Sequence, residues 1–437
     1  MSALPTARLV AYGALAAPLA MLSLPVYVHI PKFYAEQFGL ALGTQGALLL
    51  AARGFDAIQD PCFGYLSDRA RVRGIDRRRW VLGGAPLLAA ASYGLFAPPA
   101  IAVAHIALWF FAMLMLVYAA LALVQISYHA YGAELSGDTF ERTRVTAIRE
   151  GLALGGILAG AVLPQLCAAA LGPRAGYARF GVWVALILLA TTFVSLRFAP
   201  SPRAVQVATV TNEGWWSAVT RPLANPAMRR LLAVFVLNGT ANAIPATLVL
   251  FYVDDVIGRG DLAGAFLFTY FATGALAMPL WPWLARRSDK RRAWLIGMGA
   301  AIAAFAAAAG LGCGDVGLYF AICALSGLAL GADLALPPAL LAELIDVEAD
   351  AGRGSPGGAY FGLWALVTKL NLALAAGLAL PLLAWLGYRP GATSSGSAVL
   401  GLTLTYALLP CVLKAGACVL LLRDRAVTRD MQWASTS

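Results

Sequence analysis

Long apolar runs alternate with short polar or charged connections along the whole chain. A transmembrane α-helix needs about 20 predominantly apolar residues, and the runs have that length. The pattern predicts twelve spanning helices, at residues 8–31, 40–66, 79–97, 101–133, 144–172, 179–198, 228–256, 261–286, 291–312, 315–346, 357–387 and 398–423. We therefore expect an all-α membrane protein.

Composition supports this fold class. Hydrophobic residues make up 60% of the chain and charged residues 12%, with a mean hydropathy of +0.75. Soluble domains average about 45–50% apolar and about 25% charged residues. The short connections leave no room for a sizeable soluble catalytic domain, and the first run reads as a retained span rather than a cleaved signal.

No cofactor is indicated by the sequence. The six cysteines are scattered through apolar segments without CxxC spacing or a neighbouring histidine cluster, which predicts neither a metal site nor a disulfide framework. No GxxxxGK[ST] phosphate-binding loop is present, so ATP is not the expected energy source.

Positive charge is concentrated in alternate connections. The segments DRARVRGIDRRR, ERTR, ARRSDKRR and RDRAVTRD all follow even-numbered predicted spans. Lys and Arg mark cytoplasmic loops, so both termini are expected in the cytoplasm of a plasma (inner) membrane protein. The net charge of +10 is thus a topology signal. The predicted partners are the lipid bilayer and a small-molecule substrate, without nucleic acid or an obligatory protein partner.

One long polar stretch falls near the middle of the chain. We predict an N-terminal six-helix half at 1–198, a cytoplasmic linker at 199–227, a C-terminal six-helix half at 228–423 and a cytoplasmic tail at 424–437. The halves also repeat a motif, because Ser67-Asp68-Arg69 recurs as Ser288-Asp289-Lys290. Parallel repeats of six spans are the architecture of the major facilitator superfamily, with the substrate site near mid-membrane.

The second predicted span, AARGFDAIQDPCFGYLSDR, carries three charges inside the membrane. Arg53, Asp56 and Asp60 are spaced i, i+3 and i+7, so one helix stripe presents all of them. Intramembrane charge is costly and is usually functional. Two carboxylates one turn apart favour binding a cation between them. The alternative is a structural pair with Arg53 that leaves one acid protonated.

This motif resembles the glycoside-pentoside-hexuronide:cation symporters. The resemblance extends to Tyr12-Gly13, to LNGTANAIPATLVLFYVDDVIGRGD, to AELID and to the intramembrane Lys369. It implies that Asp56 and Asp60 bind the coupling cation, that Arg53 supports them, and that the protein is a cation-coupled symporter of a sugar, glycoside or hexuronide-like solute working by alternating access.

The positions that match the family's sugar site are less faithful. Ala20 stands where an aspartate is expected in the first span, and Gln125 and His129 stand where an Asp and a Trp are expected in the fourth. The family's fifth-span arginine is kept as Arg149. Ala122 replaces a hydroxyl that helps the cation site, so H⁺ and Na⁺ both stay open as the coupling cation.

Polar side chains on several spans are candidates for substrate binding. They combine donors, acceptors and an aromatic wall, as polar ligands require: Gln125, Tyr128, His129, Arg149, Asn238, Asn242 and Lys369. A structural role is the alternative for His129, a counter-ion role for Lys369, and interhelical hydrogen bonding for the two asparagines.

Two further groups of charges are singled out. Asp333 lies mid-span in the tenth helix, where the family pattern does not explain it; we expect it in an intramembrane polar network or in an ion pair between the halves. Charges at the cytoplasmic helix ends are candidates for a gate that closes by pairing between the halves: Asp68, Arg69, Glu141, Arg142, Glu343, Asp346 and Arg353.

Other functions stay open at this point. Loss of two sugar-binding positions with retention of Arg149 and Lys369 also suits a carrier of lysophospholipids or another anionic amphiphile. An exporter on the same fold and a non-transporting receptor are further alternatives. An enzyme is not expected, because the sequence offers no nucleophile and base set, no metal cluster and no soluble domain.

Overall fold

The computed structural model of the chain describes residues 5–73, 75–133, 135, 139–200, 222–350, 357–390 and 396–423. Within its helices, the side chains of residues 60–62, 64, 65, 67–72, 133, 139–143, 346, 348–350 and 357–359 lie outside that description. The described residues form helices and connections without a β-strand. The chain divides into two compact units, Met1–Thr211 and Asn212–Ser437, and the division falls within the predicted linker at 199–227.

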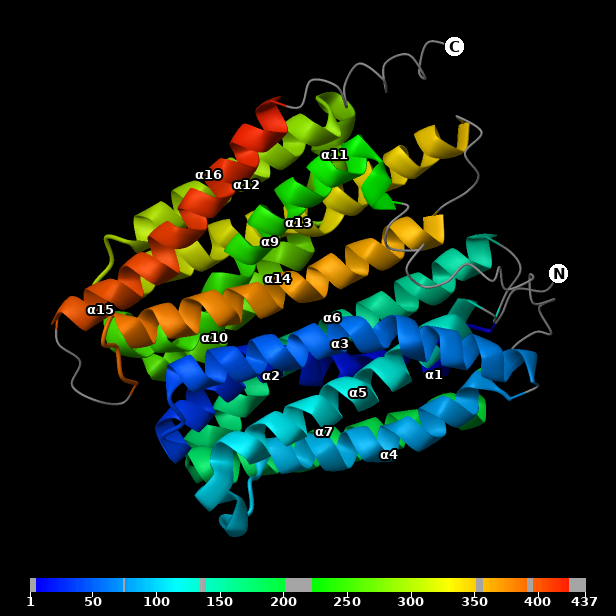
Figure 1. The fold of residues 1–437 in the computed structure, drawn as a ribbon, viewed down its shortest axis with the longest axis horizontal. Helices are drawn as coiled ribbons and strands as arrows, with labels where there is room; N and C mark the ends of the chain where they lie inside the picture. The colour runs from blue at the N-terminus through cyan, green and yellow to red at the C-terminus, as the bar shows by residue number, and fades with distance from the viewer. Residues whose placement is uncertain are drawn as a thin grey trace. The chain divides into compact units, whose positions relative to one another are not determined.

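The N-terminal unit is a bundle of long helices (Figure 1). Its helices are α1 (Thr6–Gly13), α2 (Ala16–Phe38), α3 (Leu42–Val72), α4 (Arg77–Phe96), the 3₁₀ turn η1 (Ala100–His105), α5 (Ile106–Ala133), α6 (Thr139–Leu171) and α7 (Pro173–Phe198). Helix α2 packs on α6 and α7, α4 packs on α5 and α7, and α3 packs on α5.

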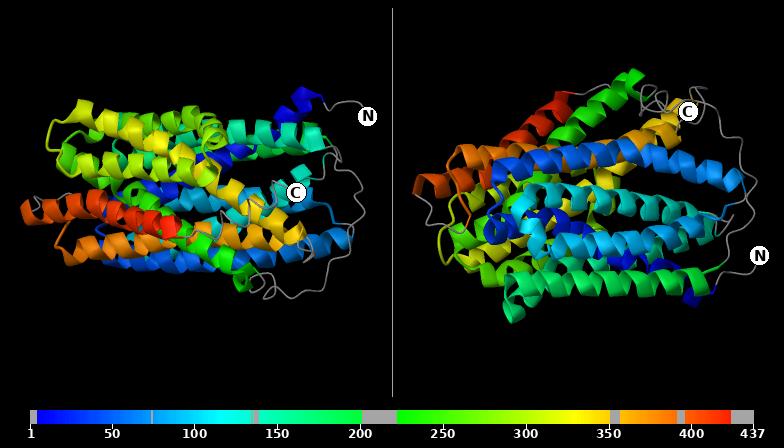
Figure 2. Two further views of the ribbon diagram at one scale, coloured as in Figure 1. Left: turned by 90° about the horizontal axis from the view of Figure 1, so that it is seen from above. Right: turned by 60° about the horizontal axis from the view of Figure 1, so that its bottom comes forward.

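The C-terminal unit is also helical (Figures 1 and 2), and it adds two π-helical turns. Its elements are α9 (Pro226–Tyr252), the π turn η2 (Val253–Ile257), the 3₁₀ turn η3 (Gly260–Leu262), α10 (Ala263–Ala277), α11 (Leu280–Arg287), α12 (Lys290–Ala308), α13 (Val316–Asp350), α14 (Gly357–Trp385), α15 (Gly396–Thr403), the π turn η4 (Leu404–Leu408) and α16 (Leu409–Arg423).

Helices in corresponding places of the two units have corresponding packing partners. Helix α2 packs on α6 as α9 packs on α14, and α4 packs on α5 as α12 packs on α13. Likewise, α3 packs on α5 as α10 packs on α13, and α4 packs on α7 as α12 packs on α16. The repetition seen in the sequence motif is therefore also present in the internal packing of each unit.

Proline accounts for two breaks in the helices. Helix α1 ends at Gly13 and α2 begins at Ala16, because Pro18 has no N–H to donate to the carbonyl of residue 14. The axes of α10 and α11 meet at 44° across Met278 and Pro279. Of the two breaks, the one between α10 and α11 bends the helix axis strongly.

Eight helices among the described residues are long and apolar enough to cross a membrane, or nine if the bent α10–α11 pair is one span. Three other predicted spans, α3, α4 and α12, are not among these helices. Helix α3 contains Arg53, Asp56 and Asp60, α4 begins with three arginines, and α12 begins with Lys290-Arg291-Arg292. The twelve expected spans therefore exceed the nine apolar ones by these three helices, each of which contains charged residues.

Glycine allows helices α2 and α6 to approach very closely. A Cβ atom added to Gly156 would lie 2.0 Å from the carbonyl oxygen of Ala17, and one added to Gly160 would lie 2.5 Å from that of Met21. These glycines are four residues apart, the small-xxx-small spacing that brings helix backbones together in membranes. Gly155, beside them, has open space at the same position.

Candidate functional site

Asp56 is buried within the N-terminal unit, with 3% of its surface exposed. Its Oδ2 atom lies 3.7 Å from a guanidinium nitrogen of Arg53, and its Oδ1 atom accepts a hydrogen bond of 3.2 Å from Gln59. All three residues lie on α3, so the helical spacing read from the sequence does bring Arg53 to Asp56. The 3.7 Å separation makes this an ion pair by distance rather than a hydrogen bond.

Tyr118 of α5 contributes to this site and was missed by the sequence reasoning. The guanidinium carbon of Arg53 lies 4.3 Å from the centre of the Tyr118 ring, a cation–π distance. Tyr118 is 2% exposed, so the arginine is held between a buried ring and a buried carboxylate. The available signal was the helical spacing of Tyr118 to Ala122, Gln125 and His129, which puts all four on one stripe of α5.

Asp60, the second predicted cation ligand, lies on α3, but its side chain is outside the described residues. The same holds for Asp68, Glu141, Arg142 and Asp346 of the predicted cytoplasmic gate; Arg353 lies outside the described residues altogether. Their roles therefore stay predictions. Glu343, another predicted gate charge, forms an ion pair with Lys290, within the C-terminal unit.

The three candidate substrate residues of α5 differ in burial. Tyr128 is 1% exposed, and its hydroxyl donates to the carbonyl of Tyr12 at 2.9 Å while the Tyr12 hydroxyl donates to the carbonyl of Tyr128 at 3.2 Å. The two rings stack at 4.6 Å. Gln125 is half-buried and His129 is exposed. Tyr128 thus joins α1 to α5, whereas Gln125 and His129 are the candidates on this helix that are not fully enclosed.

Arg149 of α6 forms an ion pair with the adjacent Glu150. Its Nε and one terminal nitrogen donate to one carboxylate oxygen of Glu150, at 3.1 and 2.6 Å. The Arg149 side chain is 17% exposed and that of Glu150 is 61% exposed. The sequence reasoning did not include Glu150, which adjoins Arg149 along the chain.

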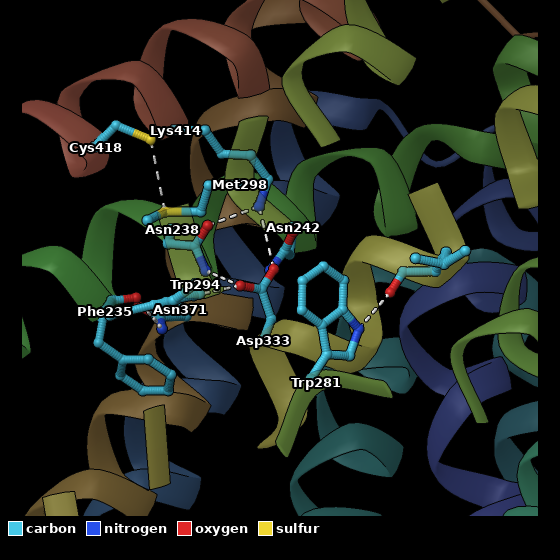
Figure 3. Close-up of polar contacts among 11 residues, drawn as sticks. Phe235, Asn238, Asn242, Trp281, Trp294, Met298, Asp333, Asn371, Lys414 and Cys418 are labelled. Atoms are coloured by element: carbon cyan, nitrogen blue, oxygen red, sulfur yellow. Dashed lines mark hydrogen bonds and ion pairs between the residues drawn. The ribbon is translucent and has the colours of Figure 1, made fainter. Parts of the chain in front are cut away.

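Asp333 lies at the centre of a polar cluster in the C-terminal unit (Figure 3). It accepts hydrogen bonds from Asn238 at 2.8 Å, from Asn242 at 2.7 Å, from the indole of Trp294 at 2.7 Å and from Lys414 at 3.2 Å. The donors come from α9, α12 and α16, and the acceptor from α13. The network that was expected around Asp333 is therefore present within one unit.

Lys414 is the partner that the sequence reasoning missed. Its side chain is 0% exposed, and its ammonium group also donates to the Asn238 carbonyl oxygen at 2.6 Å. The described ion pair of Asp333 is with this residue of the same unit, not with a residue of the N-terminal half. The signal was available, because Lys414 interrupts the apolar run YALLPCVLKAGACVLLL.

The two asparagines and Lys369, all predicted to bind substrate, have different surroundings. Asn238 is 1% exposed and lies in the Asp333 cluster, whereas Asn242 is half-buried at its edge. Lys369 is half-buried on α14. Two residues further on, Asn371 is 3% exposed and donates to the carbonyl of Phe235 at 3.3 Å, which joins α14 to α9.

Helix α2 also holds buried polar residues that the sequence reasoning did not single out. His29 is 0% exposed, with its Nδ1 atom 3.1 Å from the hydroxyl of Tyr177 on α7. Lys32, one turn later, is 8% exposed and lies 3.8 Å from Glu36. A histidine, a lysine and a glutamate within an apolar span were the visible signal.

Comparison with known proteins places the whole chain in one family. The family model described as MFS/sugar transport protein matches residues 9–425. The Inner membrane symporter YicJ of Escherichia coli (strain K12) is 29% identical over 59% of this chain and 57% of its own length. The Putative glycoside/cation symporter YagG of the same organism is 28% identical over 54% and 51%. The chain spans about half the length of these two relatives.

Other matches extend over nearly the whole chain. The Uncharacterized symporter YjmB of Bacillus subtilis (strain 168) is 22% identical over 88% of this chain and 84% of its own length. A solved bacterial homologue of the lysosomal transporter Spinster has a TM-score of 0.74 at 14% identity, covering 97% of both chains. The nucleoside transporter NupG has a TM-score of 0.69 at 13% identity, covering 97% and 98%.

These findings agree with the second-span motif. At 13–14% identity the solved structures establish the fold alone, that of a major facilitator transporter. The family match covers nearly the whole sequence and describes transporters, not enzymes. The chain is therefore an integral multi-pass membrane protein that belongs to the MFS/sugar transport protein family.

Proposed function

We propose that the protein couples the movement of a cation, H⁺ or Na⁺, to uptake of a sugar, glycoside or hexuronide-like solute by alternating access. The observation that carries the proposal is the buried Asp56 carboxylate on α3, paired with Arg53 over the ring of Tyr118. A carboxylate at mid-helix in the membrane needs a charged partner or a function. The names of the symporter relatives YicJ and YagG support coupling to a cation, and that of YagG supports a glycoside as substrate.

The proposed mechanism is thermodynamic linkage. A cation at Asp56 and Asp60 neutralises the acids, weakens the hold on Arg53, and raises affinity for the solute. By reciprocity, bound solute raises cation affinity by the same factor. We assign solute binding to accessible polar groups of both units, namely Gln125, His129, Arg149, Asn242 and Lys369, with Tyr128 holding α5 in place.

We propose twelve spans with both termini cytoplasmic in a plasma (inner) membrane. Eight apolar helices, the bent α10–α11 pair and the three charged helices α3, α4 and α12 together number twelve among the described residues, which supports this arrangement. The basic connections support the orientation. Asp68, Glu141, Arg142 and Asp346 remain our candidates for the cytoplasmic gate.

The test is solute-induced cation movement in proteoliposomes. The external pH and Na⁺ concentration are followed while methyl glycosides, uronides and lysophospholipids are added in turn. A glycoside or uronide that drives cation uptake in the wild type, but not in the Asp60→Asn variant, supports the proposal and identifies the cation. Cation movement driven only by lysophospholipid would contradict a sugar-like substrate and identify a lysophospholipid carrier. Solute efflux against an imposed cation gradient would indicate an exporter.

A further inference from the structure

The Asp333 cluster contains groups whose hydrogen-bonding roles are fixed by chemistry. An ionised carboxylate can only accept, and a lysine ammonium can only donate. The atoms of Asn238 and Asn242 that face Asp333 must therefore be amide nitrogens, and the atom of Asn238 that faces Lys414 must be the carbonyl oxygen. The contacts have this arrangement, with Nδ2 of each asparagine on Asp333 and Oδ1 of Asn238 on Lys414.

The two asparagines are left with different capacities. Both ends of the Asn238 amide are engaged and the residue is 1% exposed, so it has nothing to offer a ligand. Asn242 donates to Asp333 through Nδ2, and the residue is half-buried. Within the described residues, its Oδ1 atom receives no hydrogen bond. This oxygen is held facing away from the carboxylate by the bond that the nitrogen makes.

Lys414 makes this arrangement possible. A carboxylate in an apolar interior stays ionised only if it is paired and hydrogen-bonded. Asp333 has a cationic partner and three neutral donors, and its side chain is 8% exposed. Asp333 accepts hydrogen bonds from all four of these neighbours, and the amide of Asn242 is thereby held with its nitrogen on the carboxylate.

We infer that Asp333, paired with Lys414, is a positioning residue that presents the Asn242 carbonyl oxygen to a donor hydroxyl of the transported solute. That a solute hydroxyl binds here rests on the proposed function. The orientation of the Asn242 amide rests on the Asp333 cluster alone. It assigns specificity at this point to a solute hydroxyl, since a group that can only accept does not bind a carbonyl oxygen.

The first experiment tests the cluster without any solute. Thermal unfolding of the purified carrier is compared for the wild type, Asp333→Leu, Lys414→Met and the double variant. Each single change leaves a buried charge without its partner, whereas replacing both by apolar residues is often neutral. We expect a large drop in midpoint for each single variant and recovery of most of it in the double variant. Single variants with unchanged midpoints would overturn the inference.

The second experiment tests action through Asn242. Uptake of methyl glycosides is measured for Asn242→Ala, for Asp333→Leu/Lys414→Met and for all three changes together. Loss of one neutral hydrogen bond is expected to raise KM by about two- to tenfold, with kcat changed less. If Asp333 acts by orienting Asn242, adding Asn242→Ala to the double variant raises KM no further. Effects that multiply would show independent action and overturn the inference.

Two comparisons complete the test. Asn371→Ala removes a buried amide of the same unit outside the cluster, so we expect a lower midpoint with an unchanged KM. An equal rise in KM for this control would show that the effect comes from general loosening of the fold and would overturn the inference.

The second comparison uses monodeoxy glycosides. One of them should have a KM that Asn242→Ala does not change, because that glycoside lacks the hydroxyl that binds Asn242. A wild type that takes up no probe at all contradicts the proposed function and, with it, the solute part of the inference, while the unfolding comparison still judges the cluster.

Discussion

The two units each bury an aspartate inside the membrane, but they hold it in different ways. Asp56 has two neighbours on its own helix, with Arg53 at 3.7 Å and Gln59 at 3.2 Å. Asp333 is held by donors from α9, α12 and α16, at 2.7 to 3.2 Å. A carboxylate that accepts from donors on three other helices fixes those helices to one another, whereas an ion pair 3.7 Å long, beyond hydrogen-bond distance, is the easier of the two to exchange.

The difference indicates a division of labour between the units. Cation binding requires an acid that can release a positive partner and accept another, which suits Asp56. Positioning requires an acid whose partners do not change, which suits Asp333. Intramembrane charge alone therefore does not identify a coupling site, because both aspartates are buried and only their hydrogen bonding differs.

The largest expected effect comes from removing the negative charge of Asp56. In Asp56→Asn, we expect the ratio of internal to external solute to fall to about one, because the cation can no longer be bound and linked to solute movement. Downhill exchange should persist in the same vesicles. The measurement is radiolabelled solute uptake with and without an imposed cation gradient. Undiminished uphill accumulation would remove Asp56 from the coupling site.

The corresponding change at the other acid should act on stability. Asp333→Asn leaves Lys414 buried without its anion, a change that typically costs about 3–5 kcal/mol. Chemical unfolding of the detergent-solubilised carrier, followed by tryptophan fluorescence, measures it. The matched change Glu150→Gln, at a 61% exposed side chain, should cost about 0–1 kcal/mol. Equal costs for the two variants would erase the distinction between the acids.

A third change tests how firmly the helices of the N-terminal unit are fixed by packing instead of charge. Gly156→Val places a side chain where the carbonyl of Ala17 lies 2.0 Å from a Cβ atom, and overpacking of this kind costs about 1–3 kcal/mol. Gly155→Val, at a position open to 4 Å, is the control and should leave the unfolding midpoint within experimental error. A similar midpoint for both variants would contradict the close α2–α6 contact.

The smallest expected effect comes from removing the contact between Arg53 and the ring of Tyr118. Arg53→Lys keeps the positive charge beside Asp56 but loses the planar stacking on Tyr118, and cation–π contacts of this type contribute about 0.5–2 kcal/mol. We expect the cation concentration for half-maximal uptake to change by about two- to tenfold, with coupling retained. A loss of coupling as complete as in Asp56→Asn would show that Arg53 does more than support the acid.

Sequence reasoning predicted the fold class because hydropathy and charge position are local properties. The spans, the basic connections and the i, i+3 spacing of Arg53 and Asp56 all follow from neighbouring residues, and the structure has the pair at the expected place. Hydropathy was less reliable where charged residues interrupt an apolar run, as Arg53 and Asp56 do in α3. The family motif compensated there, because it recognises the charges themselves.

The C-terminal cluster shows what could not be predicted. Lys414 was visible as a lone cation in an apolar run, but its partner Asp333 lies 81 positions away and on another helix. No spacing rule connects residues on different helices, so the pairing depends on the packing of α13 against α12 and α9. For the same reason Asn238 and Asn242 could not be told apart by spacing, whereas the packing encloses Asn238 and leaves Asn242 half-buried.

The pairing of Asp333 with Lys414 also has an electrical consequence. A charge carried across the bilayer responds to the membrane voltage by about 2.3 kcal/mol per elementary charge per 100 mV. Opposite charges 3.2 Å apart that move together carry no net charge through that field. This cluster can shift during the transport cycle without sensing voltage, so the voltage dependence of any transport current must arise from other charges, among them the coupling cation and those of α3.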